Sequence, residues 1–364
     1  MMKKIDPLGD GISSVELLSI APSDLQVVNA ARVSMGKIST NFSEKDEKLI
    51  NYLAQHNHWT PFSHVQYLVE RKMPIEMYIH WCGISTDEQF VRSIISIKNS
   101  PVRPSIYEVH FYERGSLYAF LKHSIVTEEM KKTVPYSIRA FMLAFEIIPQ
   151  PDKYFIADWT HMLSQPEDEW WNKIKIFEFE NNRAPFHGSG WEVKHLSPRT
   201  KCRQAAFSSN VAKLQVAQFR IRMPIFVARQ WYKHQIGFTR NEVSRRYVSD
   251  APEFFIPNEW RLQADNVKQG SSEELHEYSE DMQGWVANAT YEMQSKYNEL
   301  INEENICPEQ SRTILPQSMY TEFVETASID AYNRLINLRS DDNAQKEIQK
   351  YAKSIKKWLP KGVK

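Results

Sequence analysis

The sequence contains few cysteines and no long apolar run. Only three cysteines occur among 364 residues, Cys82, Cys202 and Cys307, and none belongs to a CxxC pair. Their spacing indicates neither a disulfide framework nor a zinc site. No segment approaches the roughly 20 apolar residues of a transmembrane helix, and no apolar run follows the two N-terminal lysines as it would in a signal peptide. We therefore expect a cytoplasmic protein with reduced thiols and no membrane partner.

Charge of one sign is not in excess either. Lysine plus arginine and aspartate plus glutamate both number 45, which argues against a surface built to attract nucleic acid or anionic lipid. Hydrophobic residues make up 42% of the chain and charged residues 25%, as in ordinary globular proteins. The length allows one large domain or two ordinary ones, and any anion site must be local.

Four segments show clear periodicity. Residues 43–56 begin with Ser43 followed by Asp46, a capping pattern, and then place apolar residues on one helical face. Residues 64–72 are rich in β-branched and aromatic side chains and predict a strand. Residues 271–301 and 344–359 repeat apolar residues at helical intervals and predict two long helices, each with an apolar stripe.

Residues 233–248 concentrate positive charge in this neutral chain. They hold Lys233, His234, Arg240, Arg245 and Arg246, with Glu242 as the only acid. The apolar run at 221–228 before them predicts a buried strand, and loops at strand ends commonly carry binding groups. Arginine matches phosphate with two parallel hydrogen bonds, and nearby aromatic rings offer flat walls. The stretch is typical of a pocket for a flat, phosphorylated molecule; the alternative is a solvated basic face with its aromatic residues turned to the core.

The order of motifs along the chain resembles one enzyme family. Residues 229–247, RQWYKHQIGFTRNEVSRRY, resemble the signature of flavin-dependent thymidylate synthases, in which Arg-Gln-Trp precedes Arg-His-Arg and, about seven residues later, Ser-Gly-Arg-Tyr. AARVSMGK at 30–37, HNHWTPFSH at 56–64, SRTILPQSMYTEF at 311–323 and INLRSDDNAQKEIQKYA at 336–352 resemble further segments of that family, in its order. The resemblance implies a discontinuous catalytic domain of residues 1–75 and 216–364, interrupted by a proline-rich insertion at 76–215.

The resemblance also implies a fold and an activity. The fold is α+β, a small sheet with long helices packed around it, assembled as a homotetramer with FAD at subunit interfaces. In this family FAD takes hydride from NADPH and mediates transfer of a one-carbon unit from methylenetetrahydrofolate to C5 of dUMP, which gives dTMP. No enzyme cysteine attacks the pyrimidine, in agreement with the scattered cysteines here.

The resemblance assigns roles by position. Arg339 is the catalytic residue that contacts the pyrimidine and favours ionisation at N3, and Arg246 and Arg312 grip the nucleotide. The residues assigned to dUMP are Gln230, Trp231, Tyr232, Lys233, Glu242, Val243, Ser244, Arg245, Arg246, Arg312 and Arg339. Those assigned to FAD are Ser34, His58, Thr60, Lys233, His234, Gln235, Glu242, Ser328, Asp330 and Arg334.

Several positions depart from the family pattern. The triplet at 233–235 is Lys-His-Gln where Arg-His-Arg is usual, Arg245 replaces a glycine, and Ser328 and Asp330 stand where asparagine and arginine are common. Two alternatives therefore remain beside dUMP methylation. One is a related flavoenzyme that adds methyl or hydroxymethyl at C5 of UMP or dCMP. The other is a catalytically inactive nucleotide-binding scaffold.

Overall fold

The computed structural model describes residues 4–18, 22–74, 90–99, 107–122, 128–147, 194–195, 215–248, 250–264 and 271–359. Its chain forms two compact units. The first unit contains Met1–Ser19, Ala30–Ile38 and Val216–Lys364, and the second contains Ile20–Asn29 and Ser39–Gln215. One of the boundaries between the two units falls inside helix α1 (Asp24–Arg32), between Asn29 and Ala30.

The first unit is built on an antiparallel sheet of five strands in the order β1-β2-β7-β11-β8. β11 lies between β7 and β8 in this sheet. It pairs with β7 along its full length on one edge and with β8 on the other. The strands are β1 (Lys4–Ile5), β2 (Ser14–Leu17), β7 (Val216–Pro224), β8 (Phe238–Glu242) and β11 (Tyr320–Ser328).

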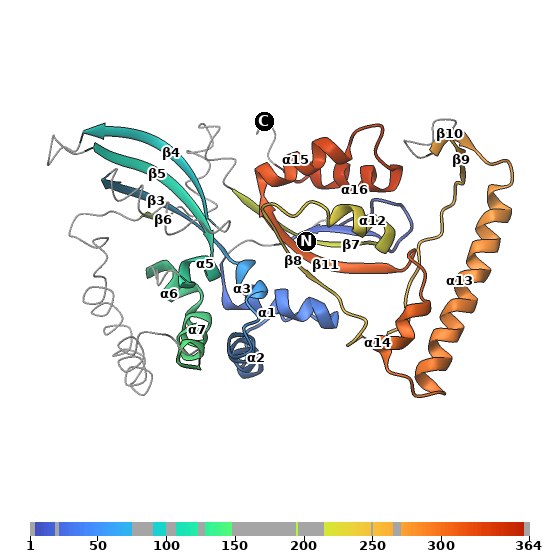
Figure 1. The fold of residues 1–364 in the computed structure, drawn as a ribbon, viewed down its shortest axis with the longest axis horizontal. Helices are drawn as coiled ribbons and strands as arrows, with labels where there is room; N and C mark the ends of the chain where they lie inside the picture. The colour runs from blue at the N-terminus through green and yellow to red at the C-terminus, as the bar shows by residue number, and fades with distance from the viewer. Residues whose placement is uncertain are drawn as a thin grey trace. The chain divides into compact units, whose positions relative to one another are not determined.

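Three helices, α12 (Ile225–Trp231), α15 (Ile329–Arg339) and α16 (Lys346–Lys356), lie on the same side of this sheet (Figure 1). The core of the unit fills the space between them and the strands, and its fully buried side chains include Phe219, Trp231, Phe323, Tyr332 and Tyr351. α15 begins where β11 ends, with Ser328 as its N-cap. Consecutive segments thus carry the chain from the middle of the sheet directly onto its helical layer.

The remaining elements of the first unit include a long helix and a small hairpin. The hairpin pairs β9 (Arg261–Gln263) with β10 (Ser271–Leu275), and α13 (Ser279–Asn302) follows it (Figure 1). The short helix α14 (Pro308–Ser311) and the 3₁₀ turn η4 (Arg312–Ile314) then lead into β11, while η1 (Val33–Met35) follows α1.

Among its described residues, the second unit has a four-stranded antiparallel sheet in the order β4-β5-β3-β6 and five helices that lie wholly within the unit. The strands are β3 (Gln66–Pro74), β4 (Phe90–Asn99), β5 (Tyr107–Ser116) and β6 (Lys194–His195). The helices are α2 (Glu44–Gln55), α3 (Thr60–Ser63), α5 (Leu117–Lys122), α6 (Glu128–Thr133) and α7 (Pro135–Ile147). α2 packs against α7, and the rings of Phe42 and Tyr136 stack with centroids 4.6 Å apart.

These elements confirm the α+β class and most of the predicted segments. α2 carries the expected capping box between Ser43 and Asp46, and α16 buries Ile348, Tyr351 and Ile355 as its periodicity requires. β3 overlaps the strand predicted at 64–72 and extends to Pro74. None of the helices within the described residues is long and apolar enough to cross a membrane.

Two predicted segments differ from the structure. Residues 271–275 form strand β10 because their backbone pairs with β9, so the predicted helix begins only at Ser279. The apolar stripe expected on that helix is largely exposed, with Trp285 70% and Met293 45% accessible. The run at 221–228 is not one strand, because Pro224 ends β7 and the chain turns into α12.

The predicted domain boundary at residue 75 also differs from the observed division. Residues 39–75 belong to the second unit, because β3 pairs with β5 along its whole length and α2 packs against α7. Most of the predicted insertion at 76–215 lies outside the described residues, including all of 148–193 and 196–214.

Candidate active site in the first unit

The basic stretch is a turn and a strand mounted between α12 and β11. α12 begins at Ile225 with Pro224 as its N-cap, and the amides of Ile225 and Phe226 donate to the carbonyls of Met319 and Gln317 at 2.9 and 3.1 Å. The turn that follows ends at Gly237, whose φ of +81° favours glycine. A Cβ atom there would lie 3.3 Å from the Ala331 Cβ, so the turn packs closely on α15. β8 then pairs with β11.

Arg339, the predicted catalytic residue, is held at the end of α15 by two contacts. Its Nε donates to Nε2 of His234 at 2.9 Å, and its Nη2 donates to the carbonyl of Gln230 at 3.2 Å. Burial, with smaller contributions from the positive charges of Arg339 and Arg240, lowers the pKa of His234 to about 4. A neutral imidazole is therefore the acceptor that faces the guanidinium.

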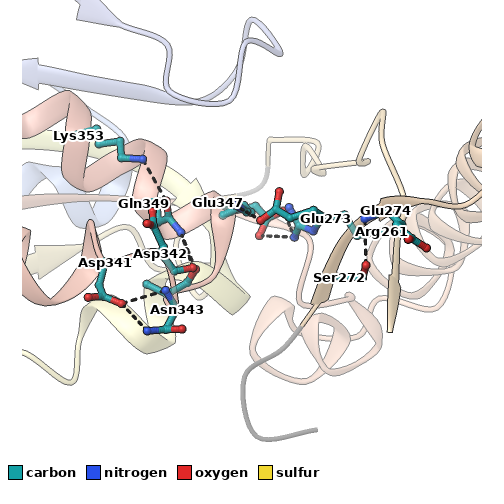
Figure 2. Close-up of polar contacts among 12 residues, drawn as sticks. Arg261, Ser272, Glu273, Glu274, Asp341, Asp342, Asn343, Glu347, Gln349 and Lys353 are labelled. Atoms are coloured by element: carbon teal, nitrogen blue, oxygen red, sulfur yellow. Dashed lines mark hydrogen bonds and ion pairs between the residues drawn. The ribbon is translucent and has the colours of Figure 1, made fainter. Parts of the chain in front are cut away.

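The loop that follows Arg339 is fixed by its own hydrogen bonds (Figure 2). Asp341 Oδ1 accepts from both the amide and the side chain of Asn343 at 2.9 Å, and Gln349 Nε2 donates to the Ala344 carbonyl at 2.8 Å. Gln345, at the end of the loop, accepts a hydrogen bond from the side chain of Gln230. The loop is thereby tied to α12 as well as to α16.

The β9–β10 hairpin contacts the first turn of α16 through two ion pairs (Figure 2). Arg261 Nη2 lies 2.9 and 3.3 Å from the two carboxylate oxygens of Glu347. Lys346 Nζ lies 2.5 Å from Glu273 Oε1. The hairpin therefore supports the helix that follows the Arg339 loop.

The two arginines predicted to grip the nucleotide share a neighbour in α14. Arg246 Nε lies 3.1 Å from the carboxylate of Glu309, and Arg312 Nε donates to the backbone carbonyl of Glu309 at 3.3 Å. Both arginines are exposed. The structure thus brings two arginines that lie far apart in the sequence into contact with the same residue.

Ser244 and Ser34 also meet in the structure. The amide of Ser244 donates to the Ser34 carbonyl at 3.0 Å, while the Ser34 hydroxyl donates to Ala31 at 2.8 Å. Between Ser244 and Arg246, Arg245 turns away to donate to the backbone carbonyl of Asp250, and burial lowers its pKa. The amide of Val243 is used by the sheet, where it donates to Glu322 at 2.8 Å. The Ser244 hydroxyl accepts from the backbone amide of Arg246 at 3.3 Å, so it lies beside that exposed residue.

The aromatic residues of the stretch divide between core and surface. Trp231 is completely buried and donates from Nε1 to both carboxylate oxygens of Glu325, at 3.1 and 3.2 Å. Its side chain is thus part of the core and has no surface left for a ligand. Tyr232 is half-buried, and burial together with the carboxylate of Glu242 raises its pKa. Glu242 itself is exposed and accepts from the Thr321 hydroxyl at 2.5 Å.

Sequence reasoning missed Glu325 and assigned no role to Arg240. The two are opposite each other across β11 and β8, and Arg240 Nε donates to the Glu325 carboxylate. One pattern in the sequence indicates Glu325. Phe323, Glu325 and Ala327 occupy alternate positions of one strand and so share a face, and the carboxylate interrupts an otherwise apolar row.

The residues assigned to FAD fall into both units. Lys233 and Gln235 are exposed on the turn beside α15. Gly237, which ends this turn, lies next to Arg334 of that helix. Arg334 is paired with Asp330 one helical turn before it, while Ser328 is buried and its hydroxyl caps α15 by accepting from Ala331 at 3.1 Å. His58 and Thr60 are exposed residues of the second unit, before and at the start of α3.

The sequence of this chain is similar to those of known proteins. The family model described as thymidylate synthase complementing protein matches residues 16–83 and 203–361. The flavin-dependent thymidylate synthase of Aquifex aeolicus is 29% identical over 93% of this chain and 94% of its own length. That of Thermosipho africanus is 38% identical over 38% of this chain and 61% of its own length, so this relative is matched over less than two thirds of its length. A crystal structure of a UMP/dUMP methylase from Streptomyces cacaoi is 22% identical, with a TM-score of 0.37 over 44% of this chain and 75% of that chain.

The extent of these matches decides the family. The family model covers more than half of the chain and includes residues 230–246 together with Arg312 and Arg339. It leaves out residues 84–202, which lie within the predicted insertion, although the Aquifex relative is aligned over nearly the full length of both chains. The chain belongs to the thymidylate synthase complementing protein family.

Proposed function

We propose that this protein is a flavin-dependent thymidylate synthase that methylates C5 of dUMP to give dTMP. The observation that carries the proposal is the arrangement of Arg339, whose guanidinium is fixed by a neutral His234 and by the Gln230 carbonyl. Family membership supports the same activity.

A fixed arginine suits the chemistry at a pyrimidine ring. Addition of a carbon at C5 is favoured when the ring carries negative charge. The positive charge of Arg339 is already in place, so it stabilises that negative charge without reorganisation of solvent. Because His234 accepts from Nε and Gln230 from Nη2, the remaining Nη1 edge is available to a base oxygen or nitrogen. The neutral histidine orients the guanidinium without adding a second charge.

Phosphate binding is assigned to Arg246 and Arg312. They approach the same residue, Glu309, and Arg246 uses its Nε on the Glu309 carboxylate. A nucleotide phosphate, with more negative charge than one carboxylate, competes with the Glu309 carboxylate for Arg246. The Ser244 hydroxyl lies next to Arg246 and adds a neutral donor.

The donor set on the 233–237 turn fits an anionic flavin cofactor. Lys233 brings a point charge and Gln235 a neutral amide, both exposed on a turn that lies against Arg334. When bound, a flavin supplies the redox chemistry that converts a transferred methylene into a methyl group. On family membership we assign NADPH as reductant, methylenetetrahydrofolate as carbon donor and a homotetramer as the assembly.

The test is growth of a thymidylate synthase-deficient bacterial strain without thymidine, complemented by the full-length chain. We expect growth with the wild type and none with Arg339→Ala at equal soluble expression. Failure of the soluble wild type would overturn the proposed activity, and growth with both would remove Arg339 from its role. Assays of the purified protein with dUMP, UMP and dCMP, read by product mass, separate dUMP methylation from modification of another pyrimidine nucleotide.

A further inference from the structure

A buried carboxylate stands where the sheet is otherwise apolar. On the face of β11 that is covered by helices, Phe323, Glu325 and Ala327 follow one another at alternate positions, and all three are at most 2% exposed. Burial raises the pKa of the Glu325 carboxyl, while Arg240 and Trp231 oppose the rise. Replacing such a buried pair by apolar residues is often neutral or stabilising, so stability alone does not account for it.

The partners of Glu325 stand at the two ends of one segment. Trp231 is the last residue of α12 and donates to both carboxylate oxygens, and Arg240 lies in β8 opposite Glu325 and donates from Nε. Residues 232–239 connect these two partners, and they include the Lys-His-Gln triplet at 233–235. One carboxylate thus binds both ends of the turn that carries the predicted cofactor contacts.

Arg240 adds contacts to the same segment. Its guanidinium carbon lies 5.5 Å from the ring centroid of Tyr232, the first residue of the segment, and 4.6 Å from that of Phe238, near its end. Cation–π contacts of this kind strengthen where solvent is excluded, and the Arg240 side chain is only 15% exposed. The distance between the ends of the segment is therefore set through Arg240 as well as through Glu325.

We propose that Glu325 and Arg240 are positioning residues, which fix the 232–239 turn so that Lys233, His234 and Gln235 present their side chains in one geometry. They touch neither nucleotide nor flavin. Their effect passes through Trp231 on one side and through Phe238 on the other, and from His234 it reaches Arg339. This inference rests on the proposed function for its consequence in catalysis, but the ordering of the turn is independent of that function.

Two variants of the full-length protein separate positioning from folding. Glu325→Gln keeps the size of the side chain and an oxygen for Trp231, but it turns an amide N–H donor or a weaker acceptor toward Arg240. The double variant Glu325→Met, Arg240→Met replaces the pair by apolar side chains of similar length and leaves no buried charge behind. The matched control is Glu322→Gln on the same strand, whose partner Arg220 lies 3.8 Å away and whose side chain is 30% exposed.

The first readout is amide hydrogen exchange of peptides covering residues 232–239 in the ligand-free protein. We expect exchange there to be faster by about tenfold or more in both variants, as for a local opening made easier by about 1.4 kcal/mol. Exchange in β7 and in the rest of β11 should stay at the wild-type rate, and Glu322→Gln should change neither. Unchanged exchange of 232–239, or an equal rise throughout the sheet, would overturn the positioning role.

The second readout is the affinity for FAD, measured by titration and by the visible spectrum of the bound flavin. We expect about tenfold weaker binding and a lower kcat in the double variant, which stays folded although Trp231 loses its acceptor. Wild-type affinity and kcat in a folded double variant would contradict the proposal. If the wild type itself bound no FAD, the proposed function would fail, while the exchange experiment would still decide whether Glu325 orders the turn.

Discussion

The Nε atom of Arg339 donates to the Nε2 atom of His234 across 2.9 Å. The geometry requires Nε2 to be unprotonated, so the imidazole proton resides on Nδ1. Arg339 comes from the end of α15 and His234 from the turn after α12, and the Gln230 carbonyl accepts a second hydrogen bond from the same guanidinium. The two motifs that define the family in this sequence are therefore physically joined, and each constrains the other.

Arg339→Lys retains the positive charge but removes the planar guanidinium group with its several N–H donors. An ammonium group has no planar edge that can serve His234, Gln230 and a pyrimidine ring together, so we expect kcat for dTMP formation to fall by about 10²–10³-fold. The unfolding temperature should change little, because the arginine is partly exposed. Steady-state kinetics check this, with Arg139→Lys, an exposed arginine of the second unit, as the control. Full activity in Arg339→Lys would mean that charge alone suffices.

His234 should titrate well below an ordinary histidine. Its pKa is lowered from 6.5 to about 4 by burial first and then by the charges of Arg339 and Arg240. The unfolded state binds a proton near pH 6.5 and the folded state only near pH 4, so the contribution of neutral His234 to stability is complete above pH 6.5 and is lost as the pH falls toward 4.

An NMR titration of the histidine ring protons measures this directly. The resonance assigned to His234, by its absence in His234→Gln, should shift at a midpoint clearly below 6.5, and Arg339→Gln should raise that midpoint by removing a nearby positive charge. A midpoint at or above 6.5 would show that the Arg339 contact is not formed in solution.

The two ion pairs of the β9–β10 hairpin shown in Figure 2 differ in their contribution to the stability of the first unit. In the Arg261–Glu347 pair, Nη2 of Arg261 donates to both carboxylate oxygens, and the side chains are mostly buried, 23% and 12% exposed. We expect Arg261→Met to lower the free energy of unfolding of the first unit by about 1–2 kcal/mol, because it leaves Glu347 without its partner. Glu273 is 81% exposed in its contact with Lys346, so Glu273→Gln, the control, should have no measurable effect. Equal effects of both changes in urea unfolding would contradict this distinction.

Local chemistry in the sequence predicted the elements whose partners are close by. Ser43 and Asp46 mark the start of α2 because the capping box is complete within four residues, and the period of α16 predicts its buried face. The stripe on α13 was predicted equally clearly, yet Trp285 is exposed. Periodicity identifies a face of a helix, but whether another element of the chain covers that face depends on the tertiary structure.

The same distinction applies to the site. The motifs predicted Arg339, His234 and Gln230, and the structure joins them. Trp231 was predicted to contact dUMP, whereas its indole is directed into the core, where it donates to Glu325, 94 residues away in sequence. A glutamate in a strand ordinarily indicates a solvent-facing position. The place of Glu325 in an apolar row indicates burial instead, but only the fold shows that its partner is Arg240.

The second unit depends on a carboxylate that caps a helix from a distance. Asp24 accepts from the amides of Tyr136 and Ser137, at 3.0 and 2.8 Å, and from the Ser137 hydroxyl, and so it serves the first turn of α7. Asp24→Ala leaves these amides without their acceptor, and we expect the free energy of unfolding of this unit to fall by about 1–3 kcal/mol. Glu44→Ala, an exposed residue in the first turn of α2, is the control and should have a much smaller effect.

The pH dependence gives this contact a second signature. Burial raises the pKa of Asp24 from 3.8 to about 6, so the folded state holds its proton where the unfolded state has lost it. The stabilising contribution of the protonated carboxyl is therefore complete below about pH 3.8 and declines as the pH rises through 6. We expect the difference in unfolding free energy between the wild type and Asp24→Ala to be larger at pH 4 than at pH 7. A difference that grows with pH would instead mean that the ionised carboxylate is the preferred cap of α7, as its two backbone hydrogen bonds at a helix N-terminus would favour.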